Sequence, residues 1–581
     1  MSNSVNIKIN NVDVTAPEGA TILEAARLAN IEIPTLCYLK EINAIGACRI
    51  CVVEVKGAKN LVAACVYPVS EGMEIQTSSP AILKARKMTL ELILSTHRRE
   101  CLSCIRSGSC ELQKLCKDYG VEDEGRYDGN NTSYPIDDTA AHMKRDDSKC
   151  VLCRRCVAAC EKWQNVAVIG TNDRGFNTHI GCAFDEQLGN VSCVSCGQCI
   201  VACPTGALYE KDETDKVRAA IADPEKHVIV QTAPAIRVTL GECFDYPIGT
   251  NVQGKMVAAL RRLGFDGVFD TDFTADLTIM EEAHEFLERV KGGGTLPIIT
   301  SCSPGWVKFC EHRYPEFIPN LSSCKSPQQM FGAMAKSWYA ELVGIKPENI
   351  FVVSIMPCTA KKFEVGRDLE KSLDNSDIDV ALTTRELARM IDKSGIRFTE
   401  LPDEAFDDPF KETTGAAVIF GTTGGVMEAA LRTAADLLTG EDLDSLDYSE
   451  VRGTSGIKEA TYNVAGLEVK VAVANGLMNA SKLLDSIKSG EKSYHFVEIM
   501  CCPGGCINGG GQPQQPASVR NFVDLKALRS SALYEADKDM PIRKSHKSPI
   551  IKRVYDEFLV APGSAKAHEL LHTHYIRRDR F

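Results

Sequence analysis

The spacing of hydrophobic and polar residues changes along the chain and predicts different elements in its first hundred residues. Residues 5–15 (VNIKINNVDVT) hold two alternating apolar and polar runs around Asn-Asn, a pattern typical of a β-hairpin. In residues 18–30 (EGATILEAARLAN) the apolar residues recur at helical spacing, which predicts a short helix. Residues 80–100 are expected to be helical as well.

A second change of pattern begins at about residue 224. Apolar runs alternate there with helical stretches, which is typical of an α/β domain with a largely parallel sheet. Ahead of them, residues 122–147 are polar and rich in turn formers, so we expect a long loop or linker. Beyond residue 516 we expect a tail of amphipathic helices that packs on the α/β domain. The apolar runs are residues 226–234, 296–301, 349–357 and 495–500, and the tail helices are residues 548–559 and 567–575.

Cysteine is the residue type that departs from an ordinary globular composition, with 25 residues. The first residues lack the basic region and apolar core of a secretory signal, and we find no run of about 18 or more apolar residues. We therefore expect a cytoplasmic protein without a membrane span, in which thiols stay reduced and bind metal rather than form disulfides. The net charge of −12 argues against nucleic acid or an anionic membrane as a partner.

The strongest chemical signal is a duplicated motif between residues 149 and 212. Each copy has the spacing Cys-x2-Cys-x2-Cys-x3-Cys of bacterial two-cluster ferredoxins, in which the fourth cysteine of each copy serves the other cluster. Zinc is the weaker alternative, because a zinc site needs neither the interleaved triplet nor the trailing Cys-Pro. One predicted [4Fe–4S] set is Cys150, Cys153, Cys156 and Cys203, and the other is Cys193, Cys196, Cys199 and Cys160.

Four cysteines on the hairpin-and-helix background indicate a [2Fe–2S] site. Their spacing, Cys-x10-Cys-x2-Cys-x13-Cys, has a longer first interval than plant-type ferredoxins, but the Cys-x2-Cys pair and the late fourth cysteine fit. Zinc stays open as an alternative from spacing alone. The four residues are Cys37, Cys48, Cys51 and Cys65.

A further candidate site is His97-x3-Cys101-x2-Cys104-x5-Cys110. By spacing alone, His97 is better explained as a surface residue or a helix C-terminal cap than as a ligand. The order of the sites, however, resembles the front end of two families, the large iron–sulfur subunit of NADH:quinone oxidoreductase and the large [FeFe]-hydrogenases. That resemblance implies that His97 and the three cysteines bind a [4Fe–4S] cluster, and that Cys116 is structural. Four clusters in series would then form an electron wire.

Three further stretches resemble the signature motifs of [FeFe]-hydrogenases and favour that family. Each follows an apolar strand, so their thiols are expected to meet at strand carboxyl ends, where an α/β sheet places its ligands. The glycines around Cys502 and Cys506 would let the backbone approach a bulky cluster closely. The stretches are residues 300–306 (TSCSPGW), 356–364 (MPCTAKKFE) and 498–513 (EIMCCPGGCINGGGQP).

The resemblance runs from residue 1 to the C-terminal tail and implies a hydrogen-activating H-cluster. This cofactor is a [4Fe–4S] cubane bridged by a cysteine sulfur to a diiron unit that carries CO, CN⁻ and an amine dithiolate. The resemblance implies that Cys358, Cys502 and Cys506 bind the cubane, with Cys506 as the bridge, and that Lys361 donates to a cyanide. The residues implied to contact the diiron unit are Met356, Met500, Pro234 and Gln328.

The pair Cys302-Ser303 departs from the family motif, which usually has two adjacent cysteines. In the family the first relays protons and the second is the fourth cubane ligand, so alignment makes Cys302 the relay and leaves Ser303 where a thiolate is expected. A serine hydroxyl is a poor iron ligand, whereas it can pass a proton. Three outcomes stay open: Cys302 ligates and Ser303 relays, Ser303 ligates weakly, or the cubane has an unusual fourth ligand.

The remaining proton-path positions of the family match without gaps. The matching residues are Glu282, Glu285, Arg289 and Ser322. Four other cysteines near the motifs are expected to be buried and apolar in character. These are Cys243, Cys310, Cys324 and Cys501.

Residues 418–432 (VIFGTTGGVMEAALR) predict a strand, a glycine turn and a helix, but lack the G-x-G-x-x-G of a dinucleotide site. If NAD(P)H is the electron partner, it must therefore bind another subunit. The favoured hypothesis is the catalytic subunit of a hetero-oligomeric, NAD(P)-linked hydrogenase with flavin-containing partner subunits, with possible electron bifurcation to ferredoxin. The alternatives are a stand-alone ferredoxin-dependent hydrogenase and a non-catalytic H2 sensor or electron-transfer module.

Taken together, these patterns predict a multidomain protein of α+β and α/β class. Its cofactors would be one [2Fe–2S] cluster, three [4Fe–4S] clusters and the H-cluster. The predicted domains are a β-grasp [2Fe–2S] ferredoxin domain at 1–78, a one-His/three-Cys [4Fe–4S] domain at 79–138, a 2[4Fe–4S] ferredoxin domain at 139–212, an α/β H-cluster domain at 213–515 and a small-subunit-like helical tail at 516–581.

Overall fold

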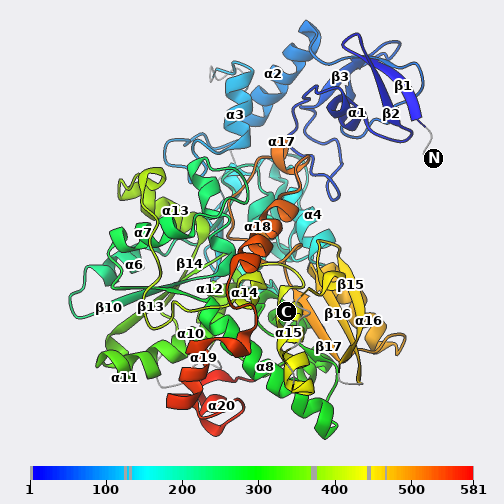
Figure 1. The fold of residues 1–581 in the computed structure, drawn as a ribbon. Helices are drawn as coiled ribbons and strands as arrows, with labels where there is room; N and C mark the ends of the chain where they lie inside the picture. The colour runs from blue at the N-terminus through cyan, green and yellow to red at the C-terminus, as the bar shows by residue number, and fades with distance from the viewer. Residues whose placement is uncertain are drawn as a thin grey trace.

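The structure is a computed structural model (Figure 1). The residues that it describes are 4–122, 127, 129, 134–367, 376–440, 442, 447–464 and 467–579.

The chain begins with the predicted hairpin, β1 (Ser4–Ile9) and β2 (Val12–Pro17). Asn10 and Asn11 form its turn with φ of 51° and 66°, a left-handed conformation that asparagine tolerates. These strands belong to a five-stranded sheet of order β2-β1-β5-β3-β4. The other three strands are β3 (Val52–Val55), β4 (Val62–Ala63) and β5 (Glu74–Gln76).

Helix α1 (Ile22–Leu28) packs on this sheet where the helical spacing predicted it. It begins at a capping box, in which Thr21 and Glu24 satisfy each other's backbone N–H groups. The second predicted helix, α2 (Pro80–Leu94), ends before the expected residue 100. Together with α3 (Glu111–Asp118) it lies beside the sheet at one end of the molecule (Figure 1).

The next segment contains the duplicated cysteine motif and little regular structure. Its helices are short, and two pairs of three-residue strands complete it. Part of the expected loop at 122–147 lies outside the described residues, and part of it forms strand β6, which pairs with β9. The elements are β6 (Met143–Arg145), α4 (Arg155–Ala158), β7 (Gly170–Asn172), β8 (His179–Gly181), α5 (Gln198–Ala202) and β9 (Leu208–Glu210).

The α/β part has the predicted largely parallel strands, divided between two four-stranded sheets. In the first sheet all neighbours are parallel. In the second only β15 and β16 are antiparallel. The first sheet has the order β11 (Gly267–Asp270), β10 (His227–Thr232), β13 (Ile350–Met356), β14 (Val380–Thr383), and the second β12 (Ile298–Ile299), β17 (Phe496–Met500), β16 (Leu467–Asn475), β15 (Ile457–Val464).

Helix α8 (Asp272–Gly292) joins the two sheets, because it is buried against both cores. Phe273 and Leu277 pack in the core around the first sheet. Ala275 and Ile279, on another side of the helix, pack in the core around the second. Helix α8 also contacts α10 (Pro327–Met334) and α15 (Gly425–Thr439).

The expected strand at the start of residues 418–432 is wrong. Residues Gly415–Val418 form helix α14, followed by one turn of 3-10 helix at Ile419–Gly421. The run is buried on all sides, and Leu533 of the tail lies against Gly421. A short apolar run buried all round carries no periodicity that separates strand from helix.

The C-terminal tail packs on the α/β domain, as predicted. Arg529 donates to both carboxyl oxygens of Glu242 at 2.7 and 2.6 Å, and to the carbonyl of Ile507 at 2.8 Å. The tail helices are α17 (Ala517–Arg520), α18 (Leu525–Asp539), α19 (Pro549–Val554) and α20 (Ala565–Leu571). Within the described residues, we find no helix that combines the length and the apolar character needed to span a bilayer.

Candidate functional site

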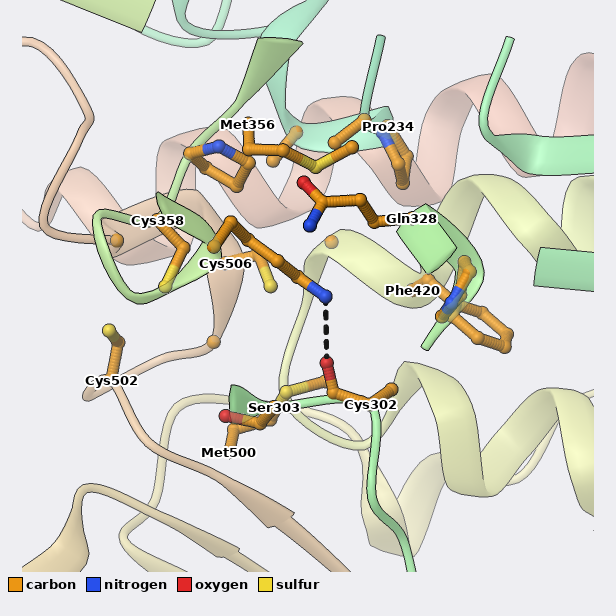
Figure 2. A pocket seen from close by; sticks show the side chains of 18 of the residues that line it. Pro234, Cys302, Ser303, Gln328, Met356, Cys358, Phe420, Met500, Cys502 and Cys506 are labelled. Carbon is orange, nitrogen blue, oxygen red and sulfur yellow. Dashed lines mark hydrogen bonds between the residues drawn. The ribbon is translucent and has the colours of Figure 1, made fainter. Parts of the chain in front are cut away.

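A buried cavity lies where strands of both sheets reach their carboxyl ends (Figure 2). Strand β10 is followed by Pro234, β13 ends at Met356, β17 ends at Met500, and Cys302 follows β12. The turn after α14, at Phe420 and Gly421, and the loop that carries Cys502 and Cys506 complete the wall. The lining includes Pro234, Cys302, Ser303, Gln328, Met356, Cys358, Lys361, Phe420, Met500, Cys501, Cys502 and Cys506.

Three of the predicted thiols, Cys358, Cys502 and Cys506, surround one side of this cavity (Figure 2). Burial raises the pKa of Cys358, and so does the proximity of Cys502 and Cys506. Burial likewise raises the pKa of Cys506 to about 12. Thiols that cluster in a dry site and repel each other as thiolates are a suitable ligand set for an iron–sulfur cluster, whose iron ions compensate those charges.

Glycine is required in the loop that carries these thiols. Gly505 has φ of 95°, and a Cβ there would lie 2.7 Å from the backbone nitrogen of Thr423. A Cβ on Gly509 would lie 2.2 Å from the carbonyl oxygen of Pro357. The loop therefore lies directly against the other walls of the cavity, which any larger residue would push apart.

The other side of the cavity is mainly apolar. Pro234, Met356, Phe420 and Met500 line it, which leaves room for a group that must be kept from water (Figure 2). Gln328 adds an amide whose Oε1 has no hydrogen-bond partner among the described residues. A buried acceptor without a partner is costly unless a bound group satisfies it.

Lys361 is the cation of the cavity wall. Its ammonium donates to Glu364 Oε2 at 2.8 Å and to the Cys302 carbonyl at 3.3 Å, the bond drawn in Figure 2. Glu364 also accepts from Ser326 at 2.9 Å and from Gln328 Nε2 at 2.8 Å. This network fixes the ammonium and the amide at the edge of the cavity.

The four proton-path residues lie in one connected group beside Cys302. Helix α8 presents Glu282, Glu285 and Arg289 on one face, because they are three and four residues apart. Ser322 donates to Glu285 Oε2 at 2.8 Å, and Arg289 donates to Glu285 Oε1 at 2.5 Å. Glu285 and Arg289 are partly exposed, whereas Glu282 is buried.

Glu282 has the environment of a carboxyl that changes protonation near neutral pH. Burial raises its pKa to about 8, and the negative charge of Glu285 acts in the same direction. Neither of its carboxyl oxygens has a hydrogen-bond partner among the described residues, although Ser322 lies beside it. Burial also raises the pKa of Cys302, and the next largest cause is Glu282, so the thiol and the carboxyl are neighbours.

The duplicated motif forms two separate cysteine cavities, and each contains one cysteine from the other copy. Among the described residues, no three His, Cys, Asp or Glu side chains are close enough to hold a single metal ion. Larger clusters are indicated by the cysteine spacing and by these cavities. One cavity is lined by Cys150, Cys153, Cys156 and Cys203, and the other by Cys160, Cys193, Cys196 and Cys199. These are the sets that the interleaved spacing predicts.

The four cysteines of the N-terminal segment also converge. Cys37 is in thiol contact with Cys48 and Cys65, and Cys51 with Cys65. Asn43 donates to the carbonyl of Cys37 at 2.7 Å and to that of Cys153 at 3.0 Å. This N-terminal site therefore lies directly beside the site of Cys153.

His97 is buried, and its Nδ1 has no hydrogen-bond partner among the described residues. Burial lowers the pKa of the imidazole to about 4, so the ring is neutral and able to bind metal. The nearby cysteines lie beside the Cys203 loop. The Cys104 sulfur is 2.6 Å from where a Cβ on Gly206 would be, and Cys110 lies 3.7 Å from the Pro204 carbonyl.

The four upstream sites are therefore not a single series, as their order in the sequence suggested. Both outer sites, that of Cys37 and that of Cys104, adjoin the site of Cys153 and Cys203. Among the described residues, the Cys196 site is the one that we find against the cavity of Cys358: a Cβ on Gly510 would lie 2.2 Å from the Cys196 carbonyl. An electron path through these sites would be branched at its outer end and single at its inner end.

The glycine turn at residues 421–425 does not present free N–H groups to a nucleotide phosphate. The Glu498 carboxylate accepts from the backbone N–H of Gly424 at 2.6 Å and of Met427 at 2.8 Å. The start of α15, where a phosphate would bind, is thus already capped. Phe420 and Gly421 line the catalytic cavity instead.

The cysteines expected to be buried and apolar behave differently from one another. Cys310 and Cys324 are buried and Cys243 is partly buried, and none of the three lines the cavity. Cys501 does line it. The signal in the sequence was the doubled cysteine at 501 and 502, which spacing alone could not interpret. Cys116 packs in the same apolar cluster as Cys110, and Cys110 and Cys101 are the charged groups that raise its pKa after burial, so its structural role stays a prediction.

Family comparisons match most of the chain. Residues 226–510 match the iron only hydrogenase large subunit, C-terminal domain, and residues 523–578 match the iron hydrogenase small subunit. Residues 2–80 match a 2Fe-2S iron-sulfur cluster binding domain. Residues 86–124 match the NADH-ubiquinone oxidoreductase-G iron-sulfur binding region, and residues 191–209 match a 4Fe-4S binding domain.

Individual relatives match over nearly their whole length. The NADP-reducing hydrogenase subunit HndD of Solidesulfovibrio fructosivorans is 49% identical, with 99% of each chain covered. Iron hydrogenase 1 of Clostridium pasteurianum is 43% identical over 98% of this chain and 99% of its own. A solved structure of [FeFe]-hydrogenase HydA1 from Chlamydomonas reinhardtii covers 64% of this chain and 100% of its own, with a TM-score of 0.57 and 42% identity.

The buried, unpartnered imidazole of His97 generates the first prediction. We expect His97→Ala to lose one [4Fe–4S] cluster, about four irons per chain, or to change that cluster's paramagnetic resonance spectrum, because the variant lacks one of the four proposed ligands. Iron analysis and the resonance spectrum of the reduced protein measure this. His284→Ala, on the outer side of α8, is the control. An unchanged iron count and spectrum in His97→Ala would contradict the role of His97.

Proposed function

The chain belongs to the iron-only, or [FeFe], hydrogenase family, and from that premise we propose that its cavity at the strand ends holds the H-cluster at which H2 is reversibly oxidised. The observation that carries this proposal is the convergence of Cys358, Cys502 and Cys506 on one side of a cavity whose other side is apolar. When bound, the cluster supplies the iron site for H2 cleavage and formation and a connection for single electrons. The protein supplies ligands, a dry wall and a route for protons.

We assign the contacts of the cofactor from this geometry and the family motifs. Cys358, Cys502 and Cys506 would hold the cubane, with Cys506 as the bridging thiolate because it lies between the thiol side and the apolar side (Figure 2). Lys361 would donate to the cyanide side, and Gln328 would contact the diiron unit with its unpartnered acceptor Oε1. Met356, Met500 and Pro234 would exclude water from the diiron unit. The Cys302-Ser303 pair does not by itself supply the usual fourth thiolate.

The upstream cysteine sites would hold one [2Fe–2S] and three [4Fe–4S] clusters. The interleaved cavities support the two ferredoxin-type clusters, the converging thiols support the [2Fe–2S] cluster, and the orphaned imidazole of His97 supports the fourth. We propose the domain limits 1–78, 79–138, 139–212, 213–515 and 516–581, with a β-grasp fold for the first domain.

The proton route is proposed to run through Cys302, Glu282, Ser322 and Glu285 to Arg289. Cys302 lines the cavity, and the buried Glu282 lies next to it. With a pKa near 8, Glu282 can hold a proton or release it at little cost, which suits a relay that runs in both directions. Ser322 links it to Glu285, whose charge is held at the partly exposed end by Arg289.

For the electron partner we propose flavin-containing, NAD(P)-linked subunits. Ferredoxin is proposed as an additional or alternative partner. If both bind, the electrons from H2 could be divided between NAD(P)⁺ and ferredoxin. The NADP-reducing relative supports this, and so does an exposed face at the His97 site. Cys101 is exposed, and the neighbouring Leu102 side chain is fully exposed. The His97 site is therefore open to solvent at Cys101 and Leu102, where an electron partner could reach it directly.

The infrared spectrum in the CO and CN⁻ stretching region tests the proposed function. The sample is anaerobic full-length protein supplied with the diiron unit, and H2-dependent viologen reduction is measured on the same sample. We expect the bands together with activity. No bands, with all iron–sulfur clusters present by iron count, would favour the non-catalytic sensor or electron-transfer module.

The environment of Glu282 predicts a pH dependence. As pH rises through about 8, Glu282 loses its proton, so we expect H2 evolution to decline above that pH and H2 oxidation to decline below it. Glu282→Gln should lower both rates by about 100-fold or more and remove this feature of the pH profile. Glu288→Gln, exposed on the same helix, is the matched control. Near-wild-type rates in Glu282→Gln, with an intact infrared spectrum, would exclude Glu282 from the route.

The exposed Leu102 predicts where the partner binds. Leu102→Asp should lower H2-dependent NADP⁺ reduction by the reconstituted complex by about tenfold, because it removes an apolar contact and adds a charge. Viologen reduction by the chain alone should not change, since viologen needs no docking surface. Val560→Asp, an exposed position in the C-terminal segment, is the control. If the chain alone exchanges electrons with ferredoxin and binds no flavoprotein, the stand-alone hydrogenase is favoured instead.

A further inference from the structure

Cys501 is a cavity thiol that the assignment above leaves without a role. It is buried and stands between Met500, the end of β17, and the cubane ligand Cys502. Its side chain lines the same cavity as Cys358, Cys502 and Cys506. The cavity therefore contains one more buried thiol than the three-cysteine assignment uses.

The polar contacts of Cys501 place it next to Ser303, the position at which the family motif has the fourth cubane ligand. Its backbone N–H donates to Ser303 Oγ at 3.2 Å. Its thiol is in contact with the thiols of Cys196 and Cys502. The only other polar contact found for the thiol among the described residues is Gln164 Oε1, at 3.9 Å, which is weak for a thiol donor.

Space for the Cys501 sulfur comes from helix α9 (Pro304–Arg313), which begins directly after Ser303. A Cβ on Gly305 would lie 2.7 Å from the Cys501 sulfur. Any side chain at 305 would therefore displace that sulfur toward the cavity or out of it. The family motif has a cysteine at position 303, where this chain has serine. The absence of a side chain at Gly305 leaves room for the Cys501 thiol close to that position.

The two alternatives from the sequence are less favourable in this geometry. Ser303 Oγ already accepts a hydrogen bond from Cys501 N–H, and an alcohol is a poor ligand for iron where thiolates are available. Glu282 is the charged group that acts most strongly on the Cys302 thiol, which suits a proton relay, and the Cys302 carbonyl accepts a hydrogen bond from Lys361. Neither residue needs to leave these contacts if a different thiol completes the set.

We propose that Cys501 is the fourth thiolate ligand of the cubane, in place of residue 303, and that Cys302 thereby stays free to relay protons. This inference deepens the proposed function and rests on it. On cluster binding, the Cys501 S–H bond breaks, its proton leaves to solvent, and a bond forms between the sulfur and one iron, with no change of oxidation state. Ser303 acts as a positioning residue that holds the Cys501 backbone through its hydroxyl.

The contact between Cys501 and Cys196 adds a consequence for electron transfer. Cys196 is a proposed ligand of the neighbouring [4Fe–4S] cluster, and its thiol touches that of Cys501. A ligand at 501 therefore brings ligand sulfurs of the two clusters into direct contact. Gly510 also lies against the Cys196 carbonyl, so the loop after Cys506 brings the two sites together at a second point.

The test compares full-length variants prepared without the diiron unit, so that only iron–sulfur clusters are present. We expect Cys501→Ala to lose about four irons per chain, or to change the resonance and Mössbauer spectra of the cubane alone. Adding Ser303→Cys to Cys501→Ala should restore the iron count and the cubane spectra, because residue 303 is in contact with residue 501 and then supplies the thiol instead. Cys302→Ala should keep the cubane and, after loading with the diiron unit, lose activity.

Cys310→Ala, a buried cysteine of α9 outside the cavity, is the matched control and should keep all clusters. The spectra of the four upstream clusters report whether each variant has folded, independently of the cubane. Full iron and unchanged cubane spectra in Cys501→Ala would overturn the proposal, as would loss of the cubane in Cys302→Ala. If the wild-type chain holds the cubane through Cys501 but shows no CO and CN⁻ bands after loading, the proposed function fails while the ligand assignment stands.

Discussion

The whole molecule depends on one constraint: the strands of two separate sheets must end at the same buried point. The cavity thiols come from positions as distant in sequence as Cys358 and Cys502, and they converge because β13 and β17 both end at the cavity. Helix α8 makes this possible, since Phe273 and Leu277 pack in the core of one sheet and Ala275 and Ile279 in the core of the other. If the two sheets moved apart, the ligand set would no longer surround one space.

The same convergence determines how the upstream cysteine sites meet the proposed H-cluster cavity. Gly510 and Gly197 place two backbones against each other, because a Cβ on either would lie within 3.0 Å of the other loop. Thr359 Oγ1, one residue after Cys358, donates to the Ser195 carbonyl at 2.8 Å, so both sides of the contact carry cysteine loops. Electron transfer between buried clusters needs short separations, and here the missing side chains of glycine provide them.

The proposed proton path leads to a different face. It follows one side of α8 from the buried Glu282 to the partly exposed Arg289. Because burial raises the pKa of Glu282 to about 8, the interior end of the path is neither permanently charged nor permanently neutral near neutral pH. The helix that holds the two sheets together thus also carries the proposed proton route, which begins at Glu282, about one turn after Ile279.

The sequence by itself determined which residues could carry chemistry. The hairpin around Asn10 and Asn11, the interleaved ferredoxin motif and the three cysteine motifs were readable because they depend on local spacing, and short-range geometry follows directly from chain connectivity. The helical start of residues 418–432 was misjudged, since a run buried on all sides has no periodicity. Only the tertiary structure decided that the upstream sites branch at Cys153 and Cys203, and that Cys501 lies beside Ser303. Both depend on contacts between segments far apart in sequence, which no local pattern specifies.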